Sequence, residues 1–254
     1  SRITEALNHC WCSIHQSATL EPMDEYKDSI GLPYDSEVKI YGSPFPDENK
    51  FSIYKRGITT QYEALNRDDE MLQKIVDDIG KLISDVDRNT IFFFPSYRLM
   101  NSVVRALDGV KNDIFIESQG MSQPVLMELV DEFKKNGGDL FSVIGGRLSE
   151  GMDFPGKELE VAVMVGIPYP KPTARQRGLQ HYYDLKFGKG WDYTVKAPAV
   201  RKILQATGRL IRSEEDRGVS IILDERAVHF KQYIPNLKLV EDVNGEIEGF
   251  FDLS

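Results

Sequence analysis

Short apolar runs alternate with longer amphipathic stretches from about residue 90 onward, and this alternation constrains the fold more than any other feature of the sequence. Apolar runs bounded by Gly, Pro, Asn or Asp indicate strands covered on both faces, as in a parallel sheet. Because helical spacing of apolar residues separates these runs, the sequence predicts one parallel sheet flanked by helices, which is an α/β fold. We expect five strands, at 90–94, 113–116, 140–144, 160–165 and 218–223.

The expected helices carry ordinary start signals. Ser96 follows the first strand and can cap a helix in which Leu99 and Val103 share one face. A serine followed by a proline in the first turn predicts another helix over 122–135, and helical sequence over 198–212 precedes the last strand.

Three regions fall outside this alternating unit. Residues 17–36 suggest a connector, residues 66–84 a covering helix, and residues 166–197 a long insertion with helical sequence. The segment after Asn236 is acidic, and we assign no element to it.

The charge is unevenly distributed. An overall charge of −9 argues against nonspecific binding to nucleic acid, which needs clustered Lys and Arg. Residues 171–202 nevertheless hold eight basic and two acidic side chains, a local balance of +6. No apolar run approaches the ~20 residues of a membrane-spanning helix, so we expect no contact with a membrane. Cys10 and Cys12 are the only cysteines, too few for a four-thiolate site, and we expect two reduced, buried thiols in an intracellular protein.

The segment Gln205-Ala-Thr-Gly-Arg-Leu-Ile-Arg212 carries one amide and two guanidinium groups at intervals of four and three residues. On a helix these side chains share one stripe, and Gly208 leaves room for a ligand near the backbone. Two permanently charged guanidinium groups suit a phosphate whose charge must be stabilised during transfer. The alternative is a solvated helix face on which Arg212 pairs with Asp216.

A second polar segment, Gly145-Gly-Arg-Leu-Ser-Glu-Gly-Met-Asp-Phe-Pro-Gly156, follows the strand expected at 140–144. It places glycines, hydroxyls and carboxylates at the carboxyl end of a parallel strand, where such sheets bind ligands. Asp153 could accept a hydrogen bond from a ribose hydroxyl. Residues 151–157 match a phosphate loop up to its lysine, but Glu158 replaces the Ser or Thr that ligates magnesium, and a strand follows instead of a helix. We therefore reject a phosphate loop here.

Four segments resemble, in order and approximate spacing, motifs III, IV, V and VI of superfamily-two helicases. They are most similar to the XPD (xeroderma pigmentosum group D) branch, which includes archaeal XPD and bacterial DinG-like enzymes, and they favour an archaeal member. A further segment is also similar to that branch and closes the region of resemblance: Asp216-Arg-Gly-Val-Ser-Ile-Ile-Leu-Asp-Glu-Arg226. The four segments are Ser17-Ala-Thr-Leu20, Phe93-Phe-Pro-Ser-Tyr97, Arg147-Leu-Ser-Glu-Gly-Met-Asp153 and residues 205–212.

The resemblance implies a RecA-like second motor domain of the P-loop NTPase superfamily, without a phosphate loop of its own. In that family the first motor domain carries the phosphate loop, the Asp-Glu-Ala-His box that holds Mg²⁺ and four cysteines for a 4Fe–4S cluster, and this sequence has none of them. The chain, which starts without Met, is therefore expected to be a C-terminal part that shares ATP and Mg²⁺ with a missing first domain. The implied division is 1–36 as the edge of the first domain and a connector, 37–235 as the second domain with a helical insertion at about 166–200, and 236–254 as an acidic tail.

The resemblance also implies residue roles. Arg209 and Arg212 would act at the γ-phosphate as catalytic residues, with Gln205 near the nucleotide. Three residues of the motif V segment, Glu150, Gly151 and Asp153, would bind ATP and couple it to DNA. Ser96, Tyr97, Arg147 and Ser149 would face DNA, although Ser96 could equally be a helix cap and Tyr97 a packing residue.

The basic segment 171–202 also carries aromatic residues, and rings interleaved with cations suit single-stranded DNA. Lys189 and Trp191 are the candidates, because the ring of Trp191 has little apolar company in Lys189-Gly-Trp-Asp-Tyr193. The alternative is that most of these rings form the core of an inserted helical layer.

Our leading hypothesis is the C-terminal motor domain of an ATP-dependent DNA helicase that is inactive without the first motor domain. The resemblance implies 5′ to 3′ travel, a role in DNA repair, repair or transcription factors as partners, and a place in the archaeal cytoplasm or nucleoid or the eukaryotic nucleus. The alternative is a non-catalytic, helicase-like module that binds nucleic acid or protein.

Overall fold

The computed structural model describes residues 2–7, 9–67, 69–107, 114–148 and 152–252. The chain forms two compact units. The first unit comprises residues 1–43 and 169–204, and the second comprises residues 44–168 and 205–254.

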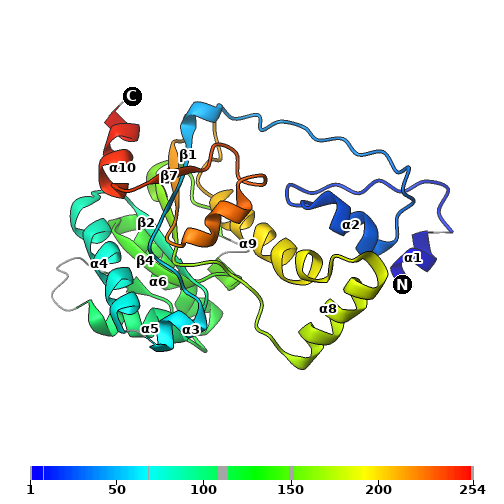
Figure 1. The fold of residues 1–254 in the computed structure, drawn as a ribbon. Coiled ribbons are helices and arrows are strands. Elements are labelled where there is room, and N and C mark those ends of the chain that lie inside the picture. Colours follow the sequence, from blue (N-terminus) through cyan, green and yellow to red (C-terminus); the bar gives the residue numbers. More distant parts are fainter. Residues whose placement is uncertain (1, 8, 68, 108–113, 149–151, 253–254) are drawn as a thin grey trace. The chain divides into compact units, whose positions relative to one another are not determined.

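A parallel sheet forms the centre of the second unit (Figure 1). The five expected strands are confirmed to within one or two residues at each end, and each lies beside its neighbour in parallel register. The strand order is β3-β4-β2-β5-β6-β1-β7. The strands are β1 (Lys50–Lys55), β2 (Thr90–Phe94), β3 (Ile114–Ile116), β4 (Asp139–Val143), β5 (Val161–Met164), β6 (Gly218–Ile222) and β7 (Lys238–Val240).

The sequence did not predict β1 and β7. Strand β1 begins and ends with lysine, and only Ile53 and Tyr54 of its residues are buried, so its apolar run is too short to recognise. Strand β7 has three residues. Each strand is held by a parallel neighbour in the sheet: β1 pairs with β6, and β7 pairs with β1.

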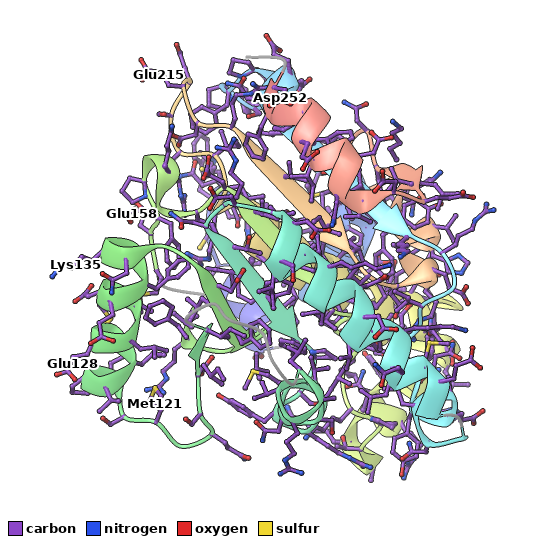
Figure 2. All side chains as sticks on the ribbon, turned by 90° about the vertical axis from the view of Figure 1, so that its left-hand side faces the viewer. Met121, Glu128, Lys135, Glu158, Glu215 and Asp252 are labelled. Atoms are coloured by element: carbon purple, nitrogen blue, oxygen red, sulfur yellow. The ribbon has the colours of Figure 1, made fainter. Side chains whose placement is uncertain are left out.

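Helices cover the sheet on both faces. One face packs against α4, α5 and α10 through a core that includes Ile79, Val103 and Phe251. Helix α6 packs next to β3, where the rings of Phe115 and Phe133 are 5.9 Å apart, and lies on the opposite side of the sheet from α4 (Figure 2). The helical elements of this unit are η1 (Asp47–Asn49), α3 (Tyr62–Arg67), α4 (Asp69–Asp85), α5 (Tyr97–Ala106), α6 (Gln123–Asn136), η2 (Gly156–Glu158), η4 (Glu225–Phe230) and α10 (Val243–Asp252).

The acidic segment after Asn236 is folded into this core. It supplies β7 and α10, and α10 buries Val243, Ile247 and Phe251 at helical spacing. The guanidinium carbon of Arg217 lies 4.5 Å from the ring centroid of Phe250. The acidic composition concealed this apolar face, because Glu248 and Asp252 lie on the exposed side of the same short helix.

The first unit is helical. It contains α1 (Arg2–Leu7), α2 (Met23–Ile30), α8 (Ala174–Phe187) and a π-helical turn, η3 (Asp192–Lys196), which continues into α9 (Ala197–Thr207). Helix α9 passes from the first unit into the second at Gln205. The expected connector and the expected insertion fold together, because Ser29 of α2 contacts the Tyr183 hydroxyl at 3.1 Å and Asp28 accepts a hydrogen bond from Tyr193. Cys10 and Cys12 are exposed, so the expectation of buried thiols is wrong, because residues 9–22 contain no buried side chain. None of the described helices is long and apolar enough to cross a membrane.

Candidate functional site

The two arginines of segment 205–212 lie beyond the end of a helix. Helix α9 ends at Thr207, so the expected helical stripe is wrong for Arg209 and Arg212, and only Gln205 lies on the last turn, where it is exposed. The expectation failed because the positions of Gln205, Arg209 and Arg212 in the sequence suit a helix, although the backbone leaves the helix after Thr207. Both arginines are nevertheless brought to the same place by tertiary contacts.

Arg209 is buried, with 8% of its surface exposed, and its guanidinium donates a hydrogen bond to the carbonyl of Met152. Arg212 is the more accessible of the two. Its Nε lies 2.7 Å from Oδ1 of Asp153, and their side chains are 41% and 69% exposed. The two guanidinium groups thus contact adjacent residues, Met152 and Asp153, and that of Arg212 is the one accessible to solvent.

Asp216 shapes the loop that carries Arg212. Its Oδ2 accepts hydrogen bonds from the backbone N–H groups of Arg212 and Ser213, at 2.7 and 2.8 Å. Burial raises the pKa of Asp216, but these backbone hydrogen bonds, together with contacts to the Ser213 side chain and the Gly156 backbone, outweigh it and lower the pKa. The alternative of a side-chain pair between Arg212 and Asp216 is therefore replaced by a backbone contact, and Arg209 does not lie on a solvated face.

The two ends of segment 145–156 lie at opposite ends of the sheet, which corrects the expectation that the segment lies at the carboxyl end of a strand. Residues 145–148 follow β4 at that end, but the carbonyl of Lys157 accepts a hydrogen bond from Asn89, directly before β2. A chain that joins two parallel strands must travel from the carboxyl end of one to the amino end of the next. In Figure 2, Glu158 and Glu215 accordingly lie near one end of the second unit and Met121 near the other.

Lys134 holds the second half of this segment from the side of α6. Its ammonium group lies 2.9 Å from Oε2 of Glu158, donates to the carbonyl of Asp153 and lies 4.9 Å from the ring centroid of Phe154. Asp153 is therefore held by its backbone and by Arg212. No sequence pattern indicated a role for Lys134, because this lysine lies in the last turn of α6, where lysines are common.

The residues expected to face DNA in this unit gather at the carboxyl end of the sheet. Ser96 caps α5 by accepting a hydrogen bond from the Leu99 backbone N–H at 3.3 Å. This confirms the alternative that Ser96 is a helix cap. The Tyr97 hydroxyl donates to Oε1 of Glu117 at 2.8 Å, and burial together with that hydrogen bond raises the pKa of Tyr97 to about 12. Arg147 is exposed and donates to the Gln123 side chain and to the Met121 carbonyl.

The site residues thus form two groups at opposite ends of the sheet. Arg209, Arg212 and Asp153 gather toward the amino ends of β5 and β6, and Ser96, Tyr97 and Arg147 gather at the carboxyl ends of β2 and β4. Three further predicted residues, Ser149, Glu150 and Gly151, lie outside the described residues.

Lys189 and Trp191 belong to the first unit. Trp191 is 53% exposed, and its ring centroid lies 5.9 Å from that of Tyr169. The Lys189 ammonium lies 3.5 Å from Oδ2 of Asp24 and 5.5 Å from the Tyr193 ring centroid. Tyr193 packs with Tyr183 at 5.6 Å, so the alternative of a packed aromatic layer describes some of these rings, and Trp191 keeps an exposed face.

Comparison with known proteins identifies the chain's relatives. A sequence model of the helicase C-terminal domain matches residues 79–237. A probable ATP-dependent helicase of Methanocaldococcus jannaschii is 30% identical, with 84% of this chain and 34% of the relative covered. The ATP-dependent DNA helicase CHL1 of Scheffersomyces stipitis is 26% identical, covering 85% of this chain and 29% of the relative. The ATP-dependent DNA helicase XPD of Sulfolobus acidocaldarius is 29% identical, covering 66% and 30%. The chain thus spans about a third of the length of these relatives.

Solved structures agree with these relatives. A structure of XPD without ligand superimposes with a TM-score of 0.62 at 26% identity, covering 75% of this chain and 40% of the other. Dbp5 of S. cerevisiae, bound to RNA and ADP with beryllium fluoride, superimposes with a TM-score of 0.57 at 13% identity, covering 94% of this chain and 54% of the other. The second similarity concerns the fold alone, and together they confirm the expected RecA-like architecture.

Proposed function

Because the chain belongs to the helicase C-terminal domain family, with ATP-dependent helicases of the XPD and CHL1 type among its relatives, we propose that it is a second motor domain whose Arg209 and Arg212 act as arginine fingers. Their ATP would be bound jointly with a first motor domain. DNA would be the substrate of the complete protein, as the names of its relatives suggest.

The convergence of Arg209 and Arg212 on Met152 and Asp153 carries this proposal. Two guanidinium groups in one place can stabilise the charge that develops on a transferred phosphoryl group. The exposed carboxylate of Asp153 suits a ribose hydroxyl, and Gln205, Glu150 and Gly151 complete the proposed nucleotide contacts. Bound ATP with its Mg²⁺ supplies the phosphoanhydride whose hydrolysis drives the motor. The other groups that hold the triphosphate would come from the first domain.

The deciding experiment removes each arginine from the full-length protein. We expect Arg212→Ala to lower kcat for ATP hydrolysis about 10³-fold or more, because an arginine finger contributes that much. Arg209→Ala should do the same. Affinity for single-stranded DNA should change little in both variants, because neither side chain lies at the carboxyl end of the sheet.

The matched control is Arg105→Ala, which removes an exposed guanidinium from the last turn of α5. It should leave hydrolysis unchanged. If Arg212→Ala also hydrolyses ATP at the full rate, the arginines are not fingers, and the chain would be better described as a helicase-like binding module.

Single-stranded DNA is the proposed nucleic-acid ligand, contacted by Ser96, Tyr97, Arg147 and Ser149 in one unit and by Lys189 and Trp191 in the other. Titration of labelled single strands at several salt concentrations separates the two kinds of contact. Lys189→Ala should reduce the salt slope by about 0.7, the value for one lost phosphate contact. Trp191→Ala should weaken binding by about 1–3 kcal/mol at an unchanged slope, because stacking is not ionic. If neither variant changes affinity, the first unit is not part of the DNA path.

The remaining properties of the complete protein also belong to this proposal. They are 5′ to 3′ travel, a role in DNA repair with repair or transcription factors as partners, a 4Fe–4S cluster in the first half of the protein, and a place in the nucleoid or nucleus. The 254-residue chain alone should show no DNA-stimulated ATP hydrolysis. Clear turnover by the pure chain would contradict the need for a first motor domain.

A further inference from the structure

Glu117 is a buried carboxylate at the carboxyl end of β3, with 1% of its surface exposed. No sequence motif drew attention to it. Its Oε1 accepts a hydrogen bond from the Tyr97 hydroxyl at 2.8 Å, and its Oε2 accepts one from the Ser142 hydroxyl at 2.5 Å. The Val143 backbone N–H also points at Oε2, at 3.4 Å. A buried carboxylate is costly unless its oxygens are hydrogen-bonded, and here both oxygens are.

These donors belong to different segments. Tyr97 opens α5 directly after β2, and Ser142 and Val143 lie at the end of β4. The backbone N–H of Glu117 itself donates to the Phe141 carbonyl at 2.9 Å. One carboxylate on β3 therefore ties together the carboxyl ends of β2, β3 and β4.

The turn that leads to Arg147 passes close to this carboxylate. Gly146 donates its N–H to the Val143 carbonyl at 3.1 Å. A Cβ atom added to Gly146 would lie 2.8 Å from that carbonyl and 3.8 Å from Oε1 of Glu117. The turn is thus packed onto the Glu117 cluster, directly before Arg147.

The geometry points to Glu117 as a positioning residue that holds the Tyr97 segment and the Gly146–Arg147 turn in the arrangement that binds single-stranded DNA. This inference rests on the proposed function. Glu117 does not itself contact DNA, because it is buried and because a carboxylate repels phosphate. Its contribution is the fixed spacing of two segments that would otherwise move independently.

The sign of one measurement separates this role from simple electrostatics. Glu117→Gln keeps the shape of the side chain and removes a negative charge near the proposed DNA surface. If the carboxylate acted only through its charge, the variant would bind single strands more tightly. A positioning role predicts the opposite, about tenfold weaker binding, because a neutral amide cannot accept from both hydroxyls and the backbone at once.

The experiment measures ATP hydrolysis by the full-length protein against the concentration of single-stranded DNA. For Glu117→Gln, the DNA concentration for half-maximal stimulation should rise about tenfold, while the KM for ATP and the rate at saturating DNA stay unchanged. A loss of stability alone would not raise the DNA concentration for half-maximal stimulation while leaving the KM for ATP and the rate at saturating DNA unchanged. Tyr97→Phe removes the other end of one hydrogen bond from a half-buried side chain, and it should raise the same concentration by a smaller factor.

Combining the two substitutions tests whether the effect passes through Tyr97. Glu117→Gln should cost less in the Tyr97→Phe background than in the wild type. Asp139→Asn is the control, since Asp139 is a buried acidic side chain at the amino end of β4, and it should leave the DNA dependence unchanged.

Two outcomes overturn the inference in different ways. If the wild type is stimulated by DNA and Glu117→Gln needs the same or a lower DNA concentration, the positioning role is wrong and the proposed function stands. If the wild type is not stimulated by DNA at all, the proposed function fails and the inference fails with it.

Discussion

Arg212 and Asp153 form an ion pair in which Nε lies 2.7 Å from Oδ1. The pair joins the loop after α9 to the connection between β4 and β5. The carboxylate contacts the guanidinium that is proposed to contact phosphate. Engagement of ATP would therefore require Arg212 to exchange or share this partner. The pair is half-exposed, so such an exchange costs little.

The two arginines should differ in what they contribute to stability. Arg209→Ala removes a buried donor and leaves the Met152 carbonyl without it, so we expect a loss of about 1–3 kcal/mol in the free energy of unfolding. Arg212→Ala breaks a half-exposed pair and should cost less than about 1 kcal/mol. Urea denaturation of the two variants measures this difference, and equal losses would contradict the burial of Arg209.

Substitution of Asp216 should destabilise the arginine loop in a pH-dependent way. Because the folded-state pKa of Asp216 lies below its unfolded value, the carboxylate stabilises the fold above the unfolded pKa, and this contribution is lost as pH falls through the folded pKa. Asp216→Ala should cost about 1–3 kcal/mol at pH 7, from the lost hydrogen bonds to Arg212 and Ser213. Unfolding experiments at pH 7 and in acid should show the gap between wild type and variant narrowing in acid. A gap independent of pH would mean that the charge of Asp216 is not involved.

Asp139 should act in the opposite direction. Burial raises its pKa from 3.8 to about 7, so the folded protein keeps a proton on Asp139 that the unfolded chain releases above about pH 4. The free energy of unfolding should therefore fall between about pH 4 and pH 7 and then level off. Asp139→Asn should be more stable than the wild type at pH 8, by about 2–4 kcal/mol from a shift of this size, and equally stable near pH 4. Thermal or urea unfolding of both proteins across this pH range checks the trend, and a variant whose advantage over the wild type is no larger at pH 8 than at pH 4 would contradict it.

Helix α10 should be required for stability despite its acidic sequence. Phe251 is buried and lies under Arg88, whose guanidinium carbon is 4.5 Å from the ring centroid. Phe251→Ala should lower the free energy of unfolding by about 3–5 kcal/mol, as large-to-small substitutions in a core do. Glu248→Ala on the exposed side of the same helix serves as control and should change stability by less than about 0.5 kcal/mol. Similar small effects of both substitutions would mean that the helix is not docked.

The strands that the sequence revealed are those with continuous apolar runs, such as 90–94 and 161–164, because both faces of a parallel strand are covered. Strand β1 was missed because half of its residues are polar or charged, and its pairing with β6 comes from residues more than 160 positions away. The end of α9 at Thr207 was also missed, since the spacing of Gln205, Arg209 and Arg212 suits a helix whether or not the backbone continues as one.

The amino-acid sequence by itself determined the class of fold and the order of the four helicase-like segments, and it supplied the two arginines that we propose as fingers, because apolar periodicity and motif spacing are local properties of the chain. Only the tertiary structure decided how those residues combine. It brought Arg212 to Asp153, Tyr97 to Glu117, and Asp216 to the backbone of Arg212, and it separated the proposed nucleotide group from the proposed DNA group at opposite ends of the sheet. The physical reason is that a parallel connection must cross from one end of the sheet to the other, so residues within one short motif are carried to different edges.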